Sequence, residues 1–173
     1  MMRVVMSDLS KWSTAVCPIG LASELACDKW MPIILRDIGL LERRTFNQLL
    51  KHNLEGISSG SLATKLQRLQ HVGLITFVSA NEHKQKKLYY LTESGIDFIP
   101  VLFAMAGWST KWHRPSAKFV EALRPYLPEA EPAMQSLLTK LRQTNLERKK
   151  LEPISWMQRD SGIVKASLGQ DLV

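Results

Sequence analysis

The chain has 173 residues, of which 45% are hydrophobic and 23% are charged. This composition is typical of a globular protein and excludes a wholly disordered chain. The length suggests one domain, or one domain with an extension, and is sufficient to bury a core without disulfide bonds. The longest run of apolar, proline and glycine residues, over residues 98–108, is about half of what a membrane-spanning helix needs. Because the N-terminal segment also lacks the apolar stretch of a signal peptide, we expect a cytoplasmic protein that does not contact a membrane.

Motifs for metal or cofactor chemistry are missing from the sequence. Its two cysteines and four scattered histidines do not have the spacing of zinc ligands. It has neither the glycine-rich motifs that bind nucleotide phosphates nor the GxSxG turn of serine hydrolases. We therefore expect no metal, no cofactor and no enzymatic activity. A small enzyme with its site between domain and tail stays open as an alternative, since carboxylates distant in sequence can meet in a fold.

The formal net charge of +7 is unevenly distributed along the chain. Residues 17–114 carry twelve lysines and arginines against eight acidic residues. Residues 58–92 alone carry five against one, so this stretch accounts for the whole excess of the larger segment. A localised excess of positive charge is what an anion-binding surface requires, and nucleic acid is the obvious candidate.

The first half of the chain has the start signals of three helices. A short helix is predicted after Pro18, where apolar residues recur at helical spacing. Asp28 is a suitable N-cap for a second helix over residues 29–40, and Thr45 for a third of one to two turns. A turn follows over residues 53–57.

A fourth helix is predicted over residues 58–72, with Ser58 as its N-cap and Gly73 at its C-terminal end. The side chains that would face the core lie at positions i, i+4 and i+7 and are Leu62, Leu66 and Leu69. The pattern then changes to that of strands over residues 74–78 and 86–91, joined by a polar loop.

The order of helix, short helix, turn, helix and hairpin is that of a winged helix-turn-helix, a mainly α fold with a small β-hairpin. In this fold the helix after the turn enters the major groove of DNA and the hairpin grips the backbone. The residues that we expect to contact DNA from the helix are Ser59, Gly60, Ser61, Thr64, Lys65 and Arg68. Those from the hairpin are Lys84, Lys86 and Lys87.

Thr92 is predicted to cap a long helix over residues 93–113, bent at Pro100. This helix is apolar on nearly all sides and must be covered. Its own chain, including the tail, is one candidate cover, and a partner subunit is the other. For the second case the expected interface residues are Phe98, Val101, Leu102, Met105, Trp108 and Trp112.

The sequence changes in character beyond Pro115, where several prolines interrupt it before a helix predicted from Pro132 to about residue 151. The last twenty residues have weak periodicity, and we expect them to be mobile. We therefore divide the chain into a winged helix-turn-helix and dimerisation domain over residues 1–114 and a partly mobile helical extension over residues 115–173.

Six short motifs lie along residues 17–112. They are, in chain order, Cys17-Pro18, Asp28-Lys29-Trp30, Arg44-Thr45-Phe46, Gly56-Ile57-Ser58, Gly73-Leu74-Ile75 and Tyr90-Leu91-Thr92. In type and order these motifs resemble those of the HxlR-type winged helix-turn-helix regulators of bacteria. The resemblance implies a homodimeric transcription factor with a recognition helix over residues 59–72 and a wing over residues 74–91, and it favours the partner subunit as the cover of helix 93–113. A winged-helix module that binds proteins and not DNA is the alternative.

Cys17 admits two interpretations. The resemblance implies that a cysteine at this position can sense oxidants or electrophiles, which requires an accessible thiol with a lowered pKa. The alternative is a small buried apolar side chain before Pro18, as is common for free cysteine. The effector of the protein, a small molecule or a redox signal, is not identified by the sequence.

Overall fold

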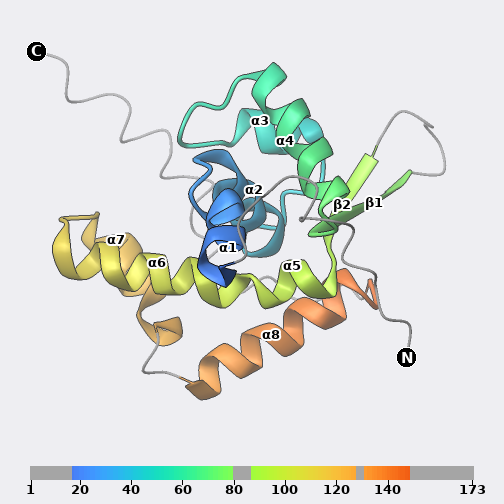
Figure 1. Cartoon of the computed structure of the whole chain (residues 1–173). Coiled ribbons are helices and arrows are strands. Elements are labelled where there is room, and N and C mark those ends of the chain that lie inside the picture. The colour runs from blue at the N-terminus through green and yellow to red at the C-terminus, as the bar shows by residue number, and fades with distance from the viewer. Residues whose placement is uncertain (1–16, 80–86, 128–130, 149–173) are drawn as a thin grey trace, which may run out of the picture.

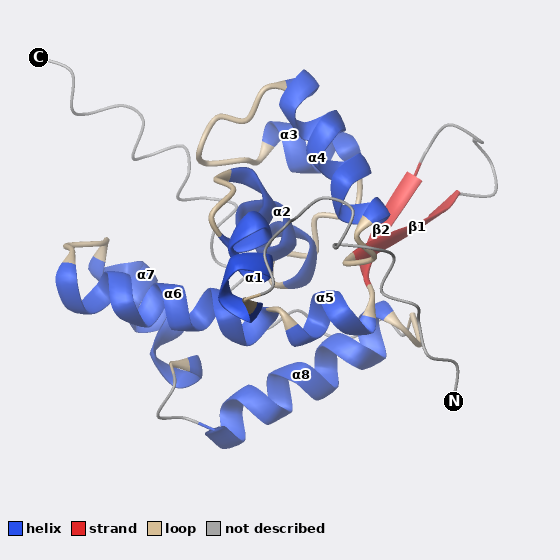
Figure 2. Cartoon of the chain, in the orientation of Figure 1, coloured by secondary structure: helices blue, strands red, loops and turns tan. Residues whose placement is uncertain are grey.

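The computed structural model describes residues 17–79, 87–127 and 131–148. Figures 1 and 2 show helices gathered around a central helix, with one β-hairpin projecting at the edge. The helix-turn-helix and its wing comprise α1 (Pro18–Ala26), α2 (Trp30–Gly39), α3 (Phe46–Lys51), α4 (Ser59–His71), β1 (Ile75–Ser79) and β2 (Lys87–Leu91). The remaining elements are α5 (Glu93–Asp97), α6 (Ile99–Trp112), α7 (Ala117–Leu123), η2 (Arg124–Tyr126) and α8 (Glu131–Asn145). The fold is a winged helix-turn-helix, as predicted.

The predicted helix starts are confirmed by side-chain hydrogen bonds. Asp28 Oδ1 accepts from the backbone N–H groups of Trp30 and Met31 at the start of α2, which begins one residue later than predicted, with Lys29 in the N-cap position. Thr45 and Gln48 form a reciprocal capping box on α3. At α4, Ser58 Oγ accepts from the N–H of the third helical residue, and Thr92 does the same for α5. Each cap supplies an acceptor to an N–H group that has no partner within its helix.

The core joins α2, α4 and the hairpin. On α4 the predicted stripe of Leu62, Leu66 and Leu69 is fully buried. It packs with the apolar face of α2, whose members include Met31, Ile34, Leu35 and Ile38. Burial of each such side chain stabilises the fold by about 1.5–3 kcal/mol, and it fixes which side of α4 remains at the surface.

The hairpin is antiparallel, with Ile75 opposite Leu91 and Ser79 opposite Lys87. Its base is buried at Ile75 and Leu91, while the far end of each strand is exposed. The base is close-packed on α5, because a Cβ on Gly95 would lie 2.1 Å from the carbonyl oxygen of Leu74. The hairpin is therefore anchored at one end and projects at the other.

The prediction of one bent helix over residues 93–113 is wrong. The structure has two helices, α5 and α6, that meet at Phe98. Pro100 lies in the first turn of α6, where its missing N–H is tolerated. In a continuous helix Pro100 could not bond to the carbonyl of Ile96 and its ring would clash there, so a new helix starts instead.

The predicted extension is packed on the domain as far as α8. Three leucines of α8, Leu137, Leu138 and Leu141, belong to the same core as α2 and α4. Arg142 also bonds to Glu93 and Asp97 of α5, so α8 lies along α5 (Figure 1). This helix ends earlier than predicted, at Asn145. The expected mobility of the last twenty residues lies outside the part of the chain that the structure describes.

Candidate nucleic-acid interface

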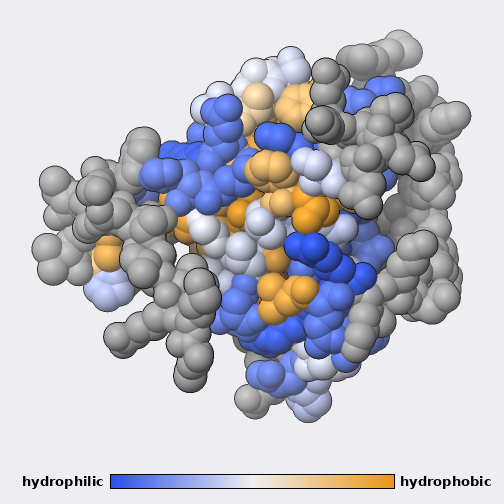
Figure 3. Space-filling view, turned by 90° about the vertical axis from the view of Figure 1, so that its right-hand side faces the viewer, coloured by the Kyte–Doolittle hydropathy of each residue, from blue (hydrophilic) through white to orange (hydrophobic). Residues whose placement is uncertain are grey.

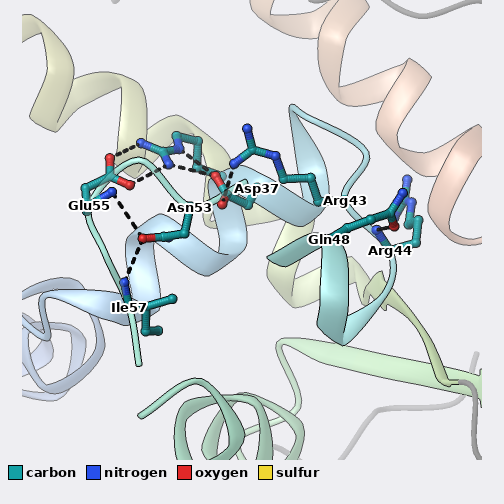
Figure 4. A network of polar contacts seen from close by, with 8 residues as sticks. Asp37, Arg43, Arg44, Gln48, Asn53, Glu55 and Ile57 are labelled. Carbon is teal, nitrogen blue, oxygen red and sulfur yellow. Dashed lines mark hydrogen bonds and ion pairs between the residues drawn. The ribbon is translucent and has the colours of Figure 1, made fainter. Parts of the chain in front are cut away.

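The turn before α4 is organised by the side chain of Asn53. Its Oδ1 accepts from the backbone N–H of Glu55 at 3.1 Å and from that of Ile57 at 3.0 Å (Figure 4). Gly56 between them has a φ of 74°, a left-handed conformation that favours glycine. This turn delivers Ser58 to the start of α4, so it sets where the helix begins.

A network of ion pairs connects this turn to α2. Arg36 bonds to Glu55 at 2.7 Å and to Asp37, which is 1% exposed. Asp37 also accepts from Arg43, and Figure 4 shows Arg43 and Glu55 on opposite sides of it. Burial opposes the charge of Arg36, but its pairing with Glu55 and Asp37 raises its pKa. Burial likewise opposes the charge of Glu55, but Arg36 lowers the pKa of that carboxyl.

The surface of α4 opposite the core is polar and lacks bulky side chains in its first half. The exposed residues there are Ser59, Gly60, Ala63, Thr64 and Gln67, with Ser61 partly exposed. A Cβ on Gly60 would meet nothing within 4 Å, so open space surrounds the backbone at this point. Such a surface allows a helix to approach base edges closely in a major groove. Gln67 was not among the predicted contacts, although its place outside the leucine stripe could have identified it.

Lys65 and Arg68 lie at the edge of this surface and not at its centre. Lys65 Nζ pairs with Asp28, the capping residue of α2. Arg68 Nη2 lies 3.8 Å from Glu24 of α1. Burial opposes the charge of Asp28, but its bond with Lys65 lowers its pKa. Both basic side chains thus connect α4 to α1 and α2, whereas we expected them to project on the same side as Ser61 and Thr64.

The hairpin presents one of its three predicted lysines within the described residues. Lys87 is exposed, and its Nζ lies 4.3 Å from the centre of the Phe77 ring. Lys84 and Lys86 fall in the loop outside the described part of the chain. On the face that bears the hairpin, small hydrophobic patches are separated by hydrophilic residues (Figure 3).

A polar cluster at the base of the hairpin was missed by sequence reasoning. Asn145 Oδ1 accepts from Arg44 Nη1 at 2.6 Å and from the backbone N–H of Leu91 at 2.9 Å. The Arg44 guanidinium also lies 4.9 Å from the centre of the Tyr90 ring, and burial lowers the pKa of Arg44. These residues are distant in sequence, so only the tertiary structure brings them together.

An apolar stripe on α6 is not covered by the part of the chain that the structure describes. The side chains of Val101, Met105, Trp108 and Trp112 are 38%, 42%, 61% and 65% exposed. Their spacing of four, three and four residues places them on one side of the helix. The other two predicted interface residues, Phe98 and Leu102, are half-buried and pack against the core of their own chain.

Cys17 is exposed at the N-terminus of α1, so the alternative interpretation, a buried apolar side chain, is wrong. The backbone N–H groups of Gly20 and Ile19, in the first turn of α1, lower the pKa of its thiol. Cys27 is exposed as well. Within residues 17–79, 87–127 and 131–148, no three potential ligands gather as a metal site would require. No helix in these ranges has the length and apolar character to cross a membrane.

Comparisons with known proteins agree with this geometry. The family model of the HxlR-like helix-turn-helix matches residues 25–117. The uncharacterized HTH-type transcriptional regulator sll1512 of Synechocystis sp. is 34% identical over 97 residues, which cover 56% of this chain and 70% of that protein. The candidate regulatory protein MalR of Fusobacterium mortiferum is 30% identical over 103 residues, 60% of this chain and 96% of that protein. The crystal structure of PA1607, a candidate transcription factor, has a TM-score of 0.51 at 27% identity and covers 60% of this chain and 70% of that one.

Proposed function

Because this chain belongs to the HxlR-like helix-turn-helix family of transcriptional regulators, we propose that it acts as a homodimer on an operator in double-stranded DNA, in the cytoplasm. The observation that carries the proposal is the polar, unobstructed first half of α4 beside a hairpin with an exposed lysine. A dimer would place two such helices in major grooves about one helical turn apart. It would then control transcription by blocking or aiding polymerase at the promoter.

The direct contacts to bases come from the exposed side of α4 in this proposal. Ser59, Gly60, Ser61 and Thr64 allow close approach, and Gln67 has the donor and acceptor that pair with adenine in the major groove. Lys65 and Arg68 contribute at the edge. Each must exchange its carboxylate partner for a phosphate, and the 3.8 Å separation of Arg68 from Glu24 makes this exchange easier for Arg68.

The contacts to phosphate come from the wing. Lys84, Lys86 and Lys87 carry long ammonium side chains that suit point-charge contacts with the DNA backbone. Such contacts add affinity for every sequence alike and make binding dependent on salt.

The homodimer is supported by the stripe of Val101, Met105, Trp108 and Trp112. Exposed apolar surface of this kind is typical of an interface. Among the described residues of the extension, α8 packs against α5 and η2, and α7 contacts α6. The four side chains of the stripe are still exposed, so a second copy could cover them. A change at Cys17 or the binding of an effector would act by altering the spacing of the two α4 helices.

The test begins with the capture of genomic fragments by the purified protein, followed by salt titrations on the captured operator and on a scrambled duplex. We expect replacement of Lys84, Lys86 and Lys87 by Gln to weaken binding to both duplexes equally. The slope of log affinity against log salt concentration should fall by about 0.9 for each phosphate that is no longer neutralised. Gln67→Ala should reduce the difference in affinity between the operator and the scrambled duplex. Lys140→Gln, at an exposed position of α8, is the control for the loss of a lysine charge. Absence of salt-dependent DNA binding would favour a protein-binding module instead.

A further inference from the structure

An apolar cleft of about 170 Å³ lies between α2 and α6 and is bounded at one end by α7. The lining residues are Pro32, Ile33 and Arg36 of α2, Leu40 directly after α2, Leu102, Phe103, Met105 and Ala106 of α6, and Leu123 of α7. The cleft is thus built from the helix that supports α4 and the helix that bears the exposed stripe.

The lining determines which ligand charge the cleft accepts. Arg36 is its one charged residue, and the guanidinium of Arg36 already pairs with Asp37 and Glu55. An anionic ligand would therefore find no unpaired positive charge, and it would lie near two carboxylates. The remaining lining atoms offer hydrophobic contact and favour an uncharged ligand.

The cleft has room for about one ring. An apolar cavity of about 150 Å³ accepts benzene, and this cleft, which is open to solvent on one side, has a comparable volume. Phe103 supplies an aromatic wall, and the side chain of Met105 has the flexibility to adapt to different ring substituents.

We propose that this cleft binds an uncharged single-ring aromatic compound, and that such a compound is the effector of the protein. The effector role rests on the proposed function, but the binding site itself does not. A ligand in the cleft would touch both α6 and Arg36, whose partner Glu55 lies in the turn that delivers α4. A shift of α2 relative to α6 would therefore change the position of α4, the recognition helix, and that of the exposed stripe on α6.

The binding test uses toluene and benzoate, which share the ring and differ in charge. We expect toluene to bind the full-length protein saturably in calorimetry, with one site per chain and at least tenfold more tightly than benzoate. Ala106→Leu should fill the cleft and weaken toluene binding at least tenfold. Ala104→Leu, an equal change at an exposed position of α6 outside the cleft, should leave it unchanged. The proposed site is wrong if benzoate binds as tightly as toluene. It is also wrong if the Ala106→Leu and Ala104→Leu variants bind toluene with the same affinity.

Further measurements test separately the ligand site, its role as an effector site and the proposed function in DNA binding. If toluene binds only a monomeric variant such as Trp108→Glu, the second copy occupies the cleft and the inference is wrong. If toluene binds as expected, its saturation should change the affinity for the captured operator at least threefold in wild type and not in Ala106→Leu. Toluene binding without this change contradicts the effector role. Loss of all DNA binding would instead refute the proposed function and leave the site intact.

Discussion

The side-chain oxygen of Asn145 in α8 accepts a hydrogen bond of 2.9 Å from the backbone N–H of Leu91, the last residue of the wing. Asn145 is 3% exposed, and its amide nitrogen donates to the carbonyl of Leu141. A residue outside the family-model match at 25–117 thus completes the hydrogen bonds at the base of the wing. The orientation of the hairpin therefore depends on the extension as well as on the helix-turn-helix.

Replacement of Asn145 by Leu should destabilise the fold by about 3 kcal/mol, because it leaves the N–H of Leu91 and a donor of Arg44 without an acceptor. Asn145→Asp keeps the acceptor oxygen and should lower the free energy of unfolding by less than Asn145→Leu. Urea unfolding monitored by circular dichroism measures both changes. Thr139→Ala, at an exposed position of the same helix, should change stability by less than about 0.5 kcal/mol. Equal stability of wild type and Asn145→Leu would contradict this role.

The pairing of Glu55 with Arg36 should make stability depend on acid pH. Burial opposes the charge of Glu55, but Arg36 lowers its pKa in the folded state, so the unfolded chain binds more protons at acid pH and stability rises with pH. The contribution of Glu55 is complete above about pH 5 and is lost as the pH falls through the ordinary glutamate value of about 4.3 to the lowered one. Urea unfolding between pH 3 and 7 should show a shallower dependence for Glu55→Gln, with the exposed Glu121→Gln as the matched charge control. If the stability of Glu55→Gln depends on pH as that of the wild type does, Glu55 does not cause the acid dependence.

Two substitutions on α6 should separate the exposed stripe from the core. Trp108→Glu should produce a soluble monomer with nearly unchanged stability, because this side chain is 61% exposed in the chain by itself. Leu102→Asp should unfold the protein or destabilise it by several kcal/mol, because the carboxylate would be placed against the core. Light scattering and thermal unfolding distinguish the two results. A Trp108→Glu variant that remains dimeric would place the interface elsewhere.

The thiol of Cys17 should react faster with a slow alkylating agent than the thiol of Cys27. Both residues are exposed, but the backbone N–H groups of Gly20 and Ile19 lower the pKa of Cys17 and so increase its thiolate fraction at neutral pH. Mass spectrometry after timed alkylation of the Cys17→Ser and Cys27→Ser variants measures each thiol separately. Equal rates in the folded protein and in an unfolded control would show that Cys17 has no special reactivity.

The sequence by itself determined the elements of the helix-turn-helix. The caps at Asp28, Thr45 and Ser58, the leucine stripe of α4 and the change of period at Leu74 are local patterns. Each of them depends on backbone hydrogen bonds or side-chain spacing within one element, and both are visible in the sequence. The family motifs lie in these same elements, and the family-model match confirms the resemblance that they indicated.

The tertiary structure decided which polar side chains remain available. Lys65 and Arg68 have the spacing of surface residues, yet Asp28 and Glu24 meet them because the fold brings α1 and the segment after it to the edge of α4. The position of Asn145 against Leu91 and the cleft between α2 and α6 are likewise absent from any local pattern. Helical periodicity tells which side of a helix is apolar, but the charge that stands opposite each polar side chain is set by the packing of distant segments.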